Sequence, residues 1–298
     1  MGLLASLFGG SKRIAKVDVA KRWDLRNRTG QGSMSKVWSA YDKKLGRMVC
    51  LKLLDKEKTH KFEEKFKLMG IKDKPTEGEL TEKLSAGSGH PNIVRTIEHG
   101  VTTAGEPYIV MEWIDGLGLN FLIETKSPQL NGNRVSYVLQ LSDALAFLHR
   151  NQFLHRDLCP RNVMVNKENQ VKLIDYGLTI PYTPVFCQPG NRTGTADYLA
   201  PEIIKRQRTD HRVDIFALGV TAFEVFTGQL PWERSLSSEE TLRRHLNTPP
   251  RLAKELKPDI PQDLNDILAK AIAKEPNERY RDVKSFRDAL AGMERQDY

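Results

Sequence analysis

The chain is organised around the sequence HRDLCPRN at residues 155–162, which LIDYG follows at residues 173–177. These stretches contribute two carboxylates, Asp157 and Asp175, and one amide, Asn162, in loops bounded by apolar runs. Oxygen donors of this kind can hold a metal-bound phosphate, and a neighbouring carboxylate can orient a hydroxyl group. The pattern therefore predicts a site for phosphate chemistry.

The composition is that of an ordinary globular protein. Of the 298 residues, 39% are hydrophobic and 28% are charged, and no apolar run approaches the roughly 20 residues of a membrane-spanning helix. The three cysteines, at positions 50, 159 and 187, form no CxxC pair, so neither a disulfide framework nor a cysteine metal site is predicted. We therefore expect a reducing, cytoplasmic environment.

The net charge of +8 comes from lysines and arginines that are spread along the chain. A positive charge attracts acidic partners, but a spread distribution is more typical of a solvated basic surface than of a binding patch. We therefore expect no nucleic acid partner, and the pattern predicts no oligomeric state.

Residues 1–22 are predicted to be an appendage, and residues 294–298 a short tail. Apolar residues near the start share one helical face, basic residues follow them, and Met1-Gly2 with Ser6 fits the N-myristoylation pattern. The alternative is a terminus that packs on the domain or frays. We keep weak membrane contact through residues 2–16 as an expectation. The residues concerned are Leu3, Leu4, Leu7, Phe8, Lys12, Arg13 and Lys16.

A β-rich lobe is predicted over residues 23 to about 111. Its first part alternates apolar and polar residues in short runs with turns at residues 30–32 and 43–46, which is typical of antiparallel strands. A charged, helix-prone segment follows at residues 56–74, and a second helix begins at Pro75 or Thr76 and ends near Leu84. The expected strands cover residues 23–25, 36–41, 47–54, 93–98 and 108–113.

A larger helical lobe is predicted over residues 118 to about 293, after a hinge at residues 112–117. Apolar residues there recur at helical spacing. The fold class is therefore α+β, with a small β-rich N-lobe that carries one main helix and a larger helical C-lobe. Binding sites tend to lie between such lobes. The expected helices cover residues 135–150, 214–227, 239–246, 262–273 and 282–293.

A glycine-rich turn at residues 30–35 joins the first two predicted strands. Gly30 and Gly32 allow backbone N–H groups to approach a phosphate closely, although a plain hairpin explains a single GxG turn equally well. Ser35 stands where a third glycine of a GxGxxG pattern would be.

Lys52 ends the apolar strand run of residues 49–52. A buried ammonium without an anionic partner is costly, so Lys52 is expected to face an anion, unless it is an edge lysine whose charge reaches solvent. Glu77 is the preferred helical partner because Leu80 and Leu84 then lie on the buried side, and Glu79 is the second choice.

These parts, in this order, resemble those of a eukaryotic-like (Hanks-type) protein kinase from about residue 23 to about residue 293. The resemblance implies that Lys52 holds the α- and β-phosphates of ATP and pairs with Glu77. It implies that Asp157 orients the substrate hydroxyl and that Asn162 and Asp175 hold Mg²⁺. Tyr176 replaces the usual Phe of this segment, and its hydroxyl needs a hydrogen-bond partner.

The resemblance also implies an adenine site. Its backbone contacts would come from Glu112 and Ile114 in the hinge, after Met111 at the gatekeeper position. The apolar side chains that would enclose the adenine ring are Val37, Cys50 and Met164.

The sequence GTADYLAPE at residues 194–202 resembles the GTxxYxAPE segment of Ser/Thr kinases. Thr195 is the position that contacts the catalytic Asp in that family. The resemblance assigns Glu202 and Arg279 to a structural ion pair and Asp214 to bracing the catalytic loop. It therefore implies ATP- and Mg²⁺-dependent phosphorylation of Ser and Thr in proteins, including autophosphorylation.

Arg156 precedes the catalytic Asp, and in such kinases this arginine can bind a phosphorylated residue of the loop at residues 178–195. Thr193 is the first candidate for that modification, and Thr183 is the second.

Cys159 stands where Ser/Thr kinases usually have a phosphate-contacting lysine. Arg161 lies two residues further on, as in many tyrosine kinases, and its guanidinium can replace the missing charge. Cys159 also becomes a candidate for oxidation or alkylation.

Tyrosine or dual specificity and a pseudokinase scaffold remain alternatives, although a pseudokinase usually lacks Lys52, Asp157 or Asp175. A small-molecule kinase would normally lack the segment at residues 194–202.

Overall fold

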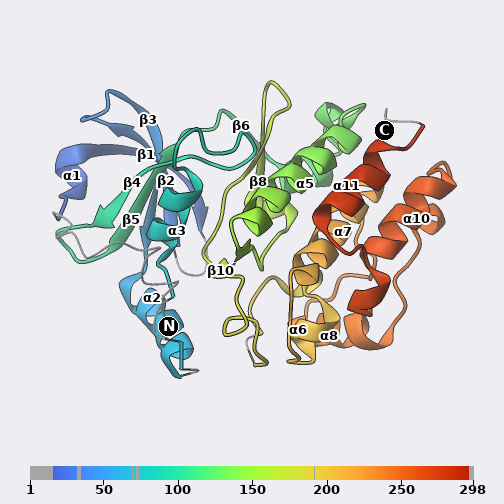
Figure 1. Cartoon of the computed structure of the whole chain (residues 1–298). Coiled ribbons are helices and arrows are strands. Elements are labelled where there is room, and N and C mark those ends of the chain that lie inside the picture. The colour runs from blue at the N-terminus through green and yellow to red at the C-terminus, as the bar shows by residue number, and fades with distance from the viewer. Residues whose placement is uncertain (1–15, 32–34, 69, 72–73, 191, 295–298) are drawn as a thin grey trace. The chain divides into compact units, whose positions relative to one another are not determined.

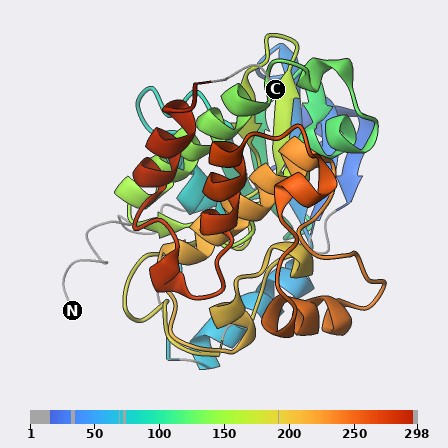
Figure 2. The same cartoon turned by 90° about the vertical axis from the view of Figure 1, so that its right-hand side faces the viewer.

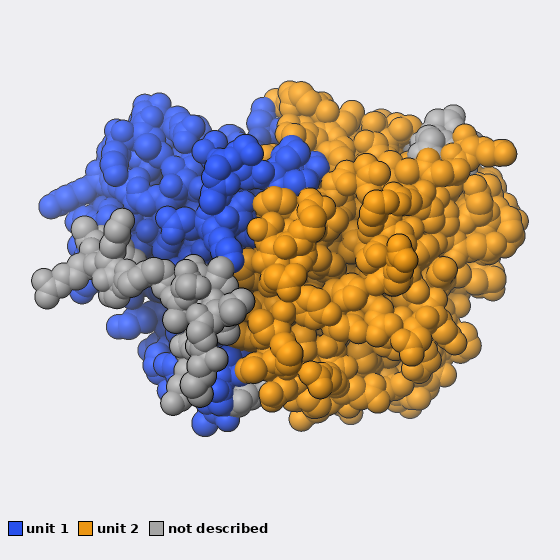
Figure 3. All heavy atoms as spheres, in the orientation of Figure 1, with its two compact units in different colours: residues 1–115 blue, residues 116–298 orange. Residues whose placement is uncertain are grey.

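The computed structural model describes residues 16–31, 35–68, 70–71, 74–190 and 192–294. The chain divides into two compact units, residues 1–115 and residues 116–298 (Figures 1 and 3). The first unit contains a five-stranded sheet and the second is mainly helical, so the predicted α+β class is confirmed. Three parts of the sequence predictions lie outside the described residues. They are residues 1–15, which carry the apolar and myristoylation signals, Gly32, and the tail at residues 295–298.

The sheet of the first unit is antiparallel, with strand order β1-β2-β3-β5-β4. Strand β4 begins three residues later than expected from the sequence, because the chain turns at Pro91 and Asn92 and the Ile93 N–H donates to the His90 carbonyl at 3.1 Å. The strands are β1 (Trp23–Gln31), β2 (Ser35–Asp42), β3 (Arg47–Leu54), β4 (Thr96–Val101) and β5 (Pro107–Glu112).

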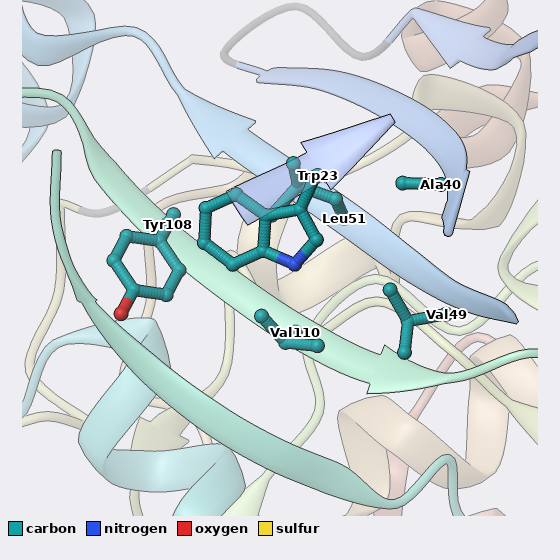
Figure 4. Close-up of a cluster of buried hydrophobic side chains, with 6 residues drawn as sticks. All are labelled: Trp23, Ala40, Val49, Leu51, Tyr108 and Val110. Carbon is teal, nitrogen blue, oxygen red and sulfur yellow. The ribbon is translucent and has the colours of Figure 1, made fainter. Parts of the chain in front are cut away.

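One face of this sheet forms a hydrophobic core. Successive side chains of a strand point to opposite faces of the sheet. Val49 and Leu51 of β3 lie on the core side, so Cys50 and Lys52 lie on the other side. The Trp23 and Tyr108 rings meet edge to face at a centroid distance of 5.2 Å. Figure 4 shows the cluster of Trp23, Ala40, Val49, Leu51, Tyr108 and Val110.

The described end of the expected N-terminal appendage packs on this sheet. The Val17 N–H donates to the Val101 carbonyl at 3.1 Å, and helix α1 (Val19–Arg22) follows. The Arg22 guanidinium donates to Asp42 at 3.0 Å and to Glu98 at 2.5 Å. Residues 16–22 therefore belong to the packed part of the unit, which is the alternative that the sequence left open for this terminus.

The first unit holds two helices of more than one turn, and they lie in the two segments where the sequence predicted helical structure. Helix α2 (Lys56–Leu68) is shorter than the predicted segment at residues 56–74. It ends where Gly70 has φ 77° and the Ile71 N–H bonds to the Phe66 carbonyl, a helix-terminating arrangement that glycine favours. Helix α3 (Glu77–Leu84) begins with a capping box of Thr76 and Glu79.

The second unit is built around helix α7 (Arg212–Thr227), whose residues from Val213 to Thr227 are all buried. A helix that is apolar on all sides belongs in a core, and α5 and α10 pack against it while α11 packs on α5 (Figures 1 and 2). Other helices of this unit are α4 (Leu119–Glu124), α5 (Arg134–Arg150), α6 (Pro201–Ile204), α8 (Ser238–Asn247), α9 (Ala253–Leu256), α10 (Gln262–Ala271) and α11 (Val283–Ala291).

Short strands of the second unit hold the loops that carry the predicted site. A three-stranded sheet has the order β6-β8-β9, and β7 pairs with β10. Over the described ranges, none of the helices combines the length and the apolar character that a bilayer crossing requires. The strands are β6 (Gly116–Gly118), β7 (Phe153–Leu154), β8 (Val163–Asn166), β9 (Val171–Leu173) and β10 (Ile180–Pro181).

A buried ion pair connects α6 to the loop before α11. Arg279 donates to both carboxylate oxygens of Glu202, at 2.7 and 2.8 Å, and also to the carbonyls of Ala273, Lys274 and Arg212. The Arg279 side chain is fully buried, so its charge and its N–H groups are satisfied within the protein.

Replacing Arg279 with Met should leave the Glu202 carboxylate buried without its cation. Removing one partner of a buried pair costs about 3–5 kcal/mol, so the free energy of unfolding in urea should fall by that amount. Arg281→Met is the control, because the Arg281 side chain is exposed and contacts the neighbouring Asp282 and the Ser285 hydroxyl at the surface. Equal stability of the two variants would contradict this role of the ion pair.

Candidate functional site

The predicted nucleotide-binding residues of the first unit share one face of the sheet. Val37 lies directly opposite Lys52, and Cys50 lies directly opposite Met111. Directly opposed residues of antiparallel strands point to the same face. Because Val49 and Leu51 occupy the core side, these four residues lie together on the other side.

Lys52 is held by Glu77. The Lys52 Nζ atom lies 2.6 Å from Glu77 Oε1, and the two side chains are only 6% and 10% exposed. Glu79, the second candidate, instead accepts hydrogen bonds from the Thr76 N–H and hydroxyl at 2.8 and 2.9 Å. The capping box thus occupies Glu79, while Glu77 in the same first turn of α3 reaches Lys52.

Helix α3 is fixed to the sheet by a close contact at Gly78. A Cβ atom at this position would lie 2.6 Å from His99 Nδ1, and His99 Nε2 lies 3.2 Å from Glu82 Oε2. Only glycine allows the helix to approach strand β4 this closely. The contact is one residue from Glu77 and therefore limits how far that carboxylate can move.

The hinge residues follow the end of β5. The Glu112 N–H donates to the Arg95 carbonyl at 3.0 Å, so this donor is used within the sheet. Ile114 is half-buried, and over the described residues its N–H and carbonyl form no hydrogen bond within the protein. Backbone groups of this kind can bind the edge of an adenine ring.

The glycine-rich turn is described at its two ends. Gly30 pairs with Val37 beside an irregularity in the β1–β2 register, and Ser35 begins β2 opposite Leu54. Met164, the remaining apolar residue of the predicted adenine site, belongs to the second unit, where it is half-buried on β8 opposite Gly118 of β6.

Asp214 fixes the loop at residues 155–162. Its carboxylate accepts the N–H groups of His155 at 2.8 Å and Arg156 at 2.9 Å, and the His149 Nε2 group at 2.9 Å. Burial acts to raise the pKa of this carboxyl, but the hydrogen bonds outweigh it and hold the pKa below the usual value. The charged carboxylate also stabilises Arg156 at φ 70°, a conformation that costs energy for a residue with a side chain.

His155 supports Asp157, two residues further along the loop. It is fully buried, and its Nδ1 atom accepts the Asp157 N–H at 3.3 Å, while burial lowers the pKa of the ring. The Tyr176 ring meets the His155 ring edge to face at 5.5 Å, and the Tyr176 hydroxyl donates to the Leu173 carbonyl at 3.1 Å. The hydroxyl that distinguishes Tyr176 from the usual Phe thus has a hydrogen-bond partner in the Leu173 carbonyl.

The Asp157 carboxylate is bound on both oxygens. Its Oδ1 atom accepts the N–H and the hydroxyl of Thr195, both at 2.8 Å, and its Oδ2 atom accepts the Asn162 side-chain amide at 3.0 Å. A carboxylate oxygen has two lone pairs, so Oδ2 can accept one further hydrogen bond. The half-buried Asp157 can therefore receive a hydroxyl proton without losing its present contacts.

Arg161 is brought to the same place. It is exposed, and its Nη2 group donates to the Thr195 hydroxyl at 3.2 Å, in the loop that Asp157 also contacts. Its positive charge lies beside the carboxylate that would orient the substrate hydroxyl, although no direct hydrogen bond joins the two.

Asn162 and Asp175 are neighbours through the backbone. The Ile174 N–H donates to the Asn162 carbonyl at 3.0 Å. The Asn162 amide nitrogen donates hydrogen bonds to Asp157. The amide oxygen of Asn162 is therefore the atom that could bind a metal. Carboxylate and amide oxygens suit Mg²⁺, which usually takes few protein ligands and completes its shell with phosphate and water. No group of three His, Cys, Asp or Glu residues in the described part of the chain could hold a metal by itself.

Cys159 does not have the reactive thiol that its sequence position suggested. Its side chain is only 1% exposed, and burial raises the pKa of the thiol to about 11. The thiolate is the reactive form, so this cysteine is both shielded and protonated at neutral pH. The structure contradicts the expectation of an oxidation or alkylation point here.

The loop that contains the predicted modification sites covers Arg156. Arg156 is buried and its Nη1 group donates to the Thr209 hydroxyl at 3.5 Å, while the Thr209 N–H donates to the Cys187 carbonyl. The Thr183 hydroxyl is buried without a partner, and Thr193 is half-buried. Both candidates are thus half-buried, and burial does not rank one above the other.

Sequence reasoning did not find two polar residues that shape the site. His149 near the end of α5 contacts Asp214, and Glu224 on the apolar helix α7 accepts the Tyr198 hydroxyl and, at 3.2 Å, the Arg234 guanidinium. A glutamate within an otherwise apolar helix is a usable signal, because a buried carboxylate needs hydrogen-bond donors.

Comparison with known proteins identifies the family. The model of the protein kinase domain matches residues 23–290. The chain is 31% identical over 279 residues to the serine/threonine-protein kinase PknB of Mycobacterium leprae, covering 91% of this chain and 43% of that protein. It is 30% identical over 285 residues to the probable serine/threonine-protein kinase PknB of Lactococcus lactis, and the match covers 94% of this chain and 43% of that protein.

A third relative gives the same result. The serine/threonine-protein kinase PknB of Mycobacterium tuberculosis is 30% identical over 284 residues, which cover 91% of this chain and 43% of that protein. The chain thus spans less than half the length of these relatives. With the family match over residues 23–290, the chain belongs to the protein kinase family.

Proposed function

We propose that this chain transfers the γ-phosphoryl group of ATP, with Mg²⁺, to Ser and Thr hydroxyls of proteins, its own included. The observation that carries the proposal is the double hydrogen bond from the Thr195 N–H and hydroxyl to Asp157. It joins the segment typical of Ser/Thr kinases to the carboxylate that would orient the substrate. The names of the relatives also support this proposal rather than a pseudokinase or a tyrosine kinase.

The first unit would bind the nucleotide. Lys52 would contact the α- and β-phosphates, and its ion pair with Glu77 at 2.6 Å holds the Lys52 side chain in place. The apolar groups of Val37, Cys50 and Met111 would contact the adenine ring, and the Ile114 backbone would bind its edge. Gly30, Gly32 and Ser35 would cover the phosphates.

The second unit would orient the hydroxyl and hold the metal. Asp157 would accept the proton of the attacking hydroxyl at Oδ2, while Thr195 and Asn162 keep the carboxylate in place. Asn162 and Asp175 would bind Mg²⁺ through their oxygens. When bound, Mg²⁺ neutralises negative charge on the β- and γ-phosphates.

Arg161 would take over the charge that the usual lysine supplies. Cys159 is buried and neutral, so it cannot stabilise a phosphate. The exposed Arg161 lies next to Thr195 and therefore beside Asp157. A cation there would stabilise the charge on the transferring phosphoryl group.

The location that fits this proposal is the cytoplasm, where ATP is present and thiols stay reduced. Contact of residues 2–16 with an anionic membrane would be weak, because one lipid anchor or one basic segment gives only reversible binding.

The proposal is tested by transfer of labelled γ-phosphate from ATP to a generic protein substrate. With Mg²⁺ the wild-type chain should label the substrate, and Asp157→Asn should lower the rate by at least about 10²-fold because general-base assistance is lost. Asp24→Asn is the control, since Asp24 is a half-exposed partner of Lys43 in the first unit. No Mg²⁺-dependent transfer above that of Asp157→Asn would indicate a pseudokinase.

Replacing Arg161 with Ala should lower kcat by about 10²-fold or more, because a preorganised charge at the transferring group is lost. Arg161→Lys should recover part of the rate, as it restores the charge without the planar guanidinium. Arg243→Ala, an exposed arginine on α8 that pairs with Glu240, is the control. An Arg161→Ala enzyme with unchanged kcat would exclude this role.

A further inference from the structure

Lys74 lies over an aromatic pair on helix α2. Its Nζ atom is 5.3 Å from the centre of the Phe62 ring and 5.5 Å from that of the Phe66 ring. The two rings meet edge to face at 5.3 Å, and Phe66 is buried. An ammonium in this position is attracted by the negative faces of both rings.

The same ammonium faces the start of helix α3. Lys74 Nζ donates to the Pro75 carbonyl at 3.3 Å, directly before the capping residue Thr76. Burial lowers the pKa of Lys74, while the nearby carboxylates of Glu77, Glu63 and Glu79 act in the opposite direction. Lys74 is therefore a partly desolvated cation between the ring pair of α2 and the acidic first turn of α3.

Helix α2 has few other means of attachment. Figure 1 shows it beyond the end of α3, away from the sheet. Most of its residues are charged, Phe66 is its only buried residue, and Leu68 is exposed. With so small an apolar contact, the orientation of α2 depends strongly on the contacts of its two rings.

We infer that Lys74 is a positioning residue that joins helix α2 to the first turn of α3 and thereby holds Glu77 within reach of Lys52. The contact of Gly78 with His99 already fixes the middle of α3, so Lys74 adjusts the first turn rather than the whole helix. Its loss should therefore weaken the pairing of Glu77 with Lys52 without abolishing it. The consequence for ATP rests on the proposed function, but the link between the helices does not.

The link is tested by hydrogen exchange of the nucleotide-free full chain, followed by mass spectrometry of peptides that cover residues 77–84. Lys74→Met should speed exchange in α3 by about threefold to tenfold, because its side chain keeps the apolar stem but loses the cation. Lys74→Arg should restore protection, since a guanidinium also stacks on aromatic rings. Lys61→Met is the matched control, because it removes an exposed charge from the same helix.

Phe62→Leu provides a second variant that keeps an apolar side chain and removes one ring. It should speed exchange in α3 as Lys74→Met does, and it decides the question if Lys74→Met does not fold. Wild-type exchange in both variants, or equal acceleration in Lys61→Met, would overturn the inference.

The functional consequence is measured separately, by titrating a fluorescent ADP analogue with Mg²⁺. Lys74→Met should raise its Kd by about threefold to tenfold, and Lys74→Arg should return it close to the wild-type value. If the wild-type chain binds no nucleotide, the proposed function fails and the exchange result still decides the role of Lys74. Faster exchange with an unchanged Kd would overturn the part of the inference that concerns Glu77 and Lys52.

Discussion

The buried carboxylate of Asp214 accepts N–H groups from His149, His155 and Arg156, and the geometry of the loop at residues 155–162 depends on it. The loop needs such an anchor because Arg156 has a positive φ and its backbone N–H is buried. Once these residues are fixed, His155 accepts the Asp157 N–H. A chain of hydrogen bonds thus leads from a helix in the core of the second unit to the carboxylate that would orient the substrate.

Each unit assembles its own part of the machinery. In the first, the alternation of side chains along β3 separates the core residues Val49 and Leu51 from Cys50 and Lys52. In the second, Thr195 joins its own loop to the distant loop at residues 155–162, because the Thr195 hydroxyl contacts both Asp157 and Arg161 of that loop. Asp157 is therefore oriented before any substrate arrives, which is the condition under which a carboxylate can act efficiently in catalysis.

The sequence predicted the elements with strong periodicity and the residues that match family motifs. Helix α7 and the helix after Thr76 were expected because an apolar run, and a Pro or Thr at the start of a helical segment, are local signals. The end of α2 was missed although Gly70 is a local signal for a helix terminus. The burial of Cys159 and the positions of Lys74 and His149 could not be predicted, since they depend on contacts between distant segments rather than on spacing along the chain.

The proposed activity is phosphorylation of Ser and Thr hydroxyls, and identifying the modified residue is the sharpest test of it. The purified chain should be incubated with ATP, Mg²⁺ and a protein substrate, and the phosphorylated residues identified by mass spectrometry. We expect phosphoserine and phosphothreonine, in the substrate and in the chain's own loop at residues 178–195. Phosphate found only on tyrosine, or no phosphate at all, would contradict it.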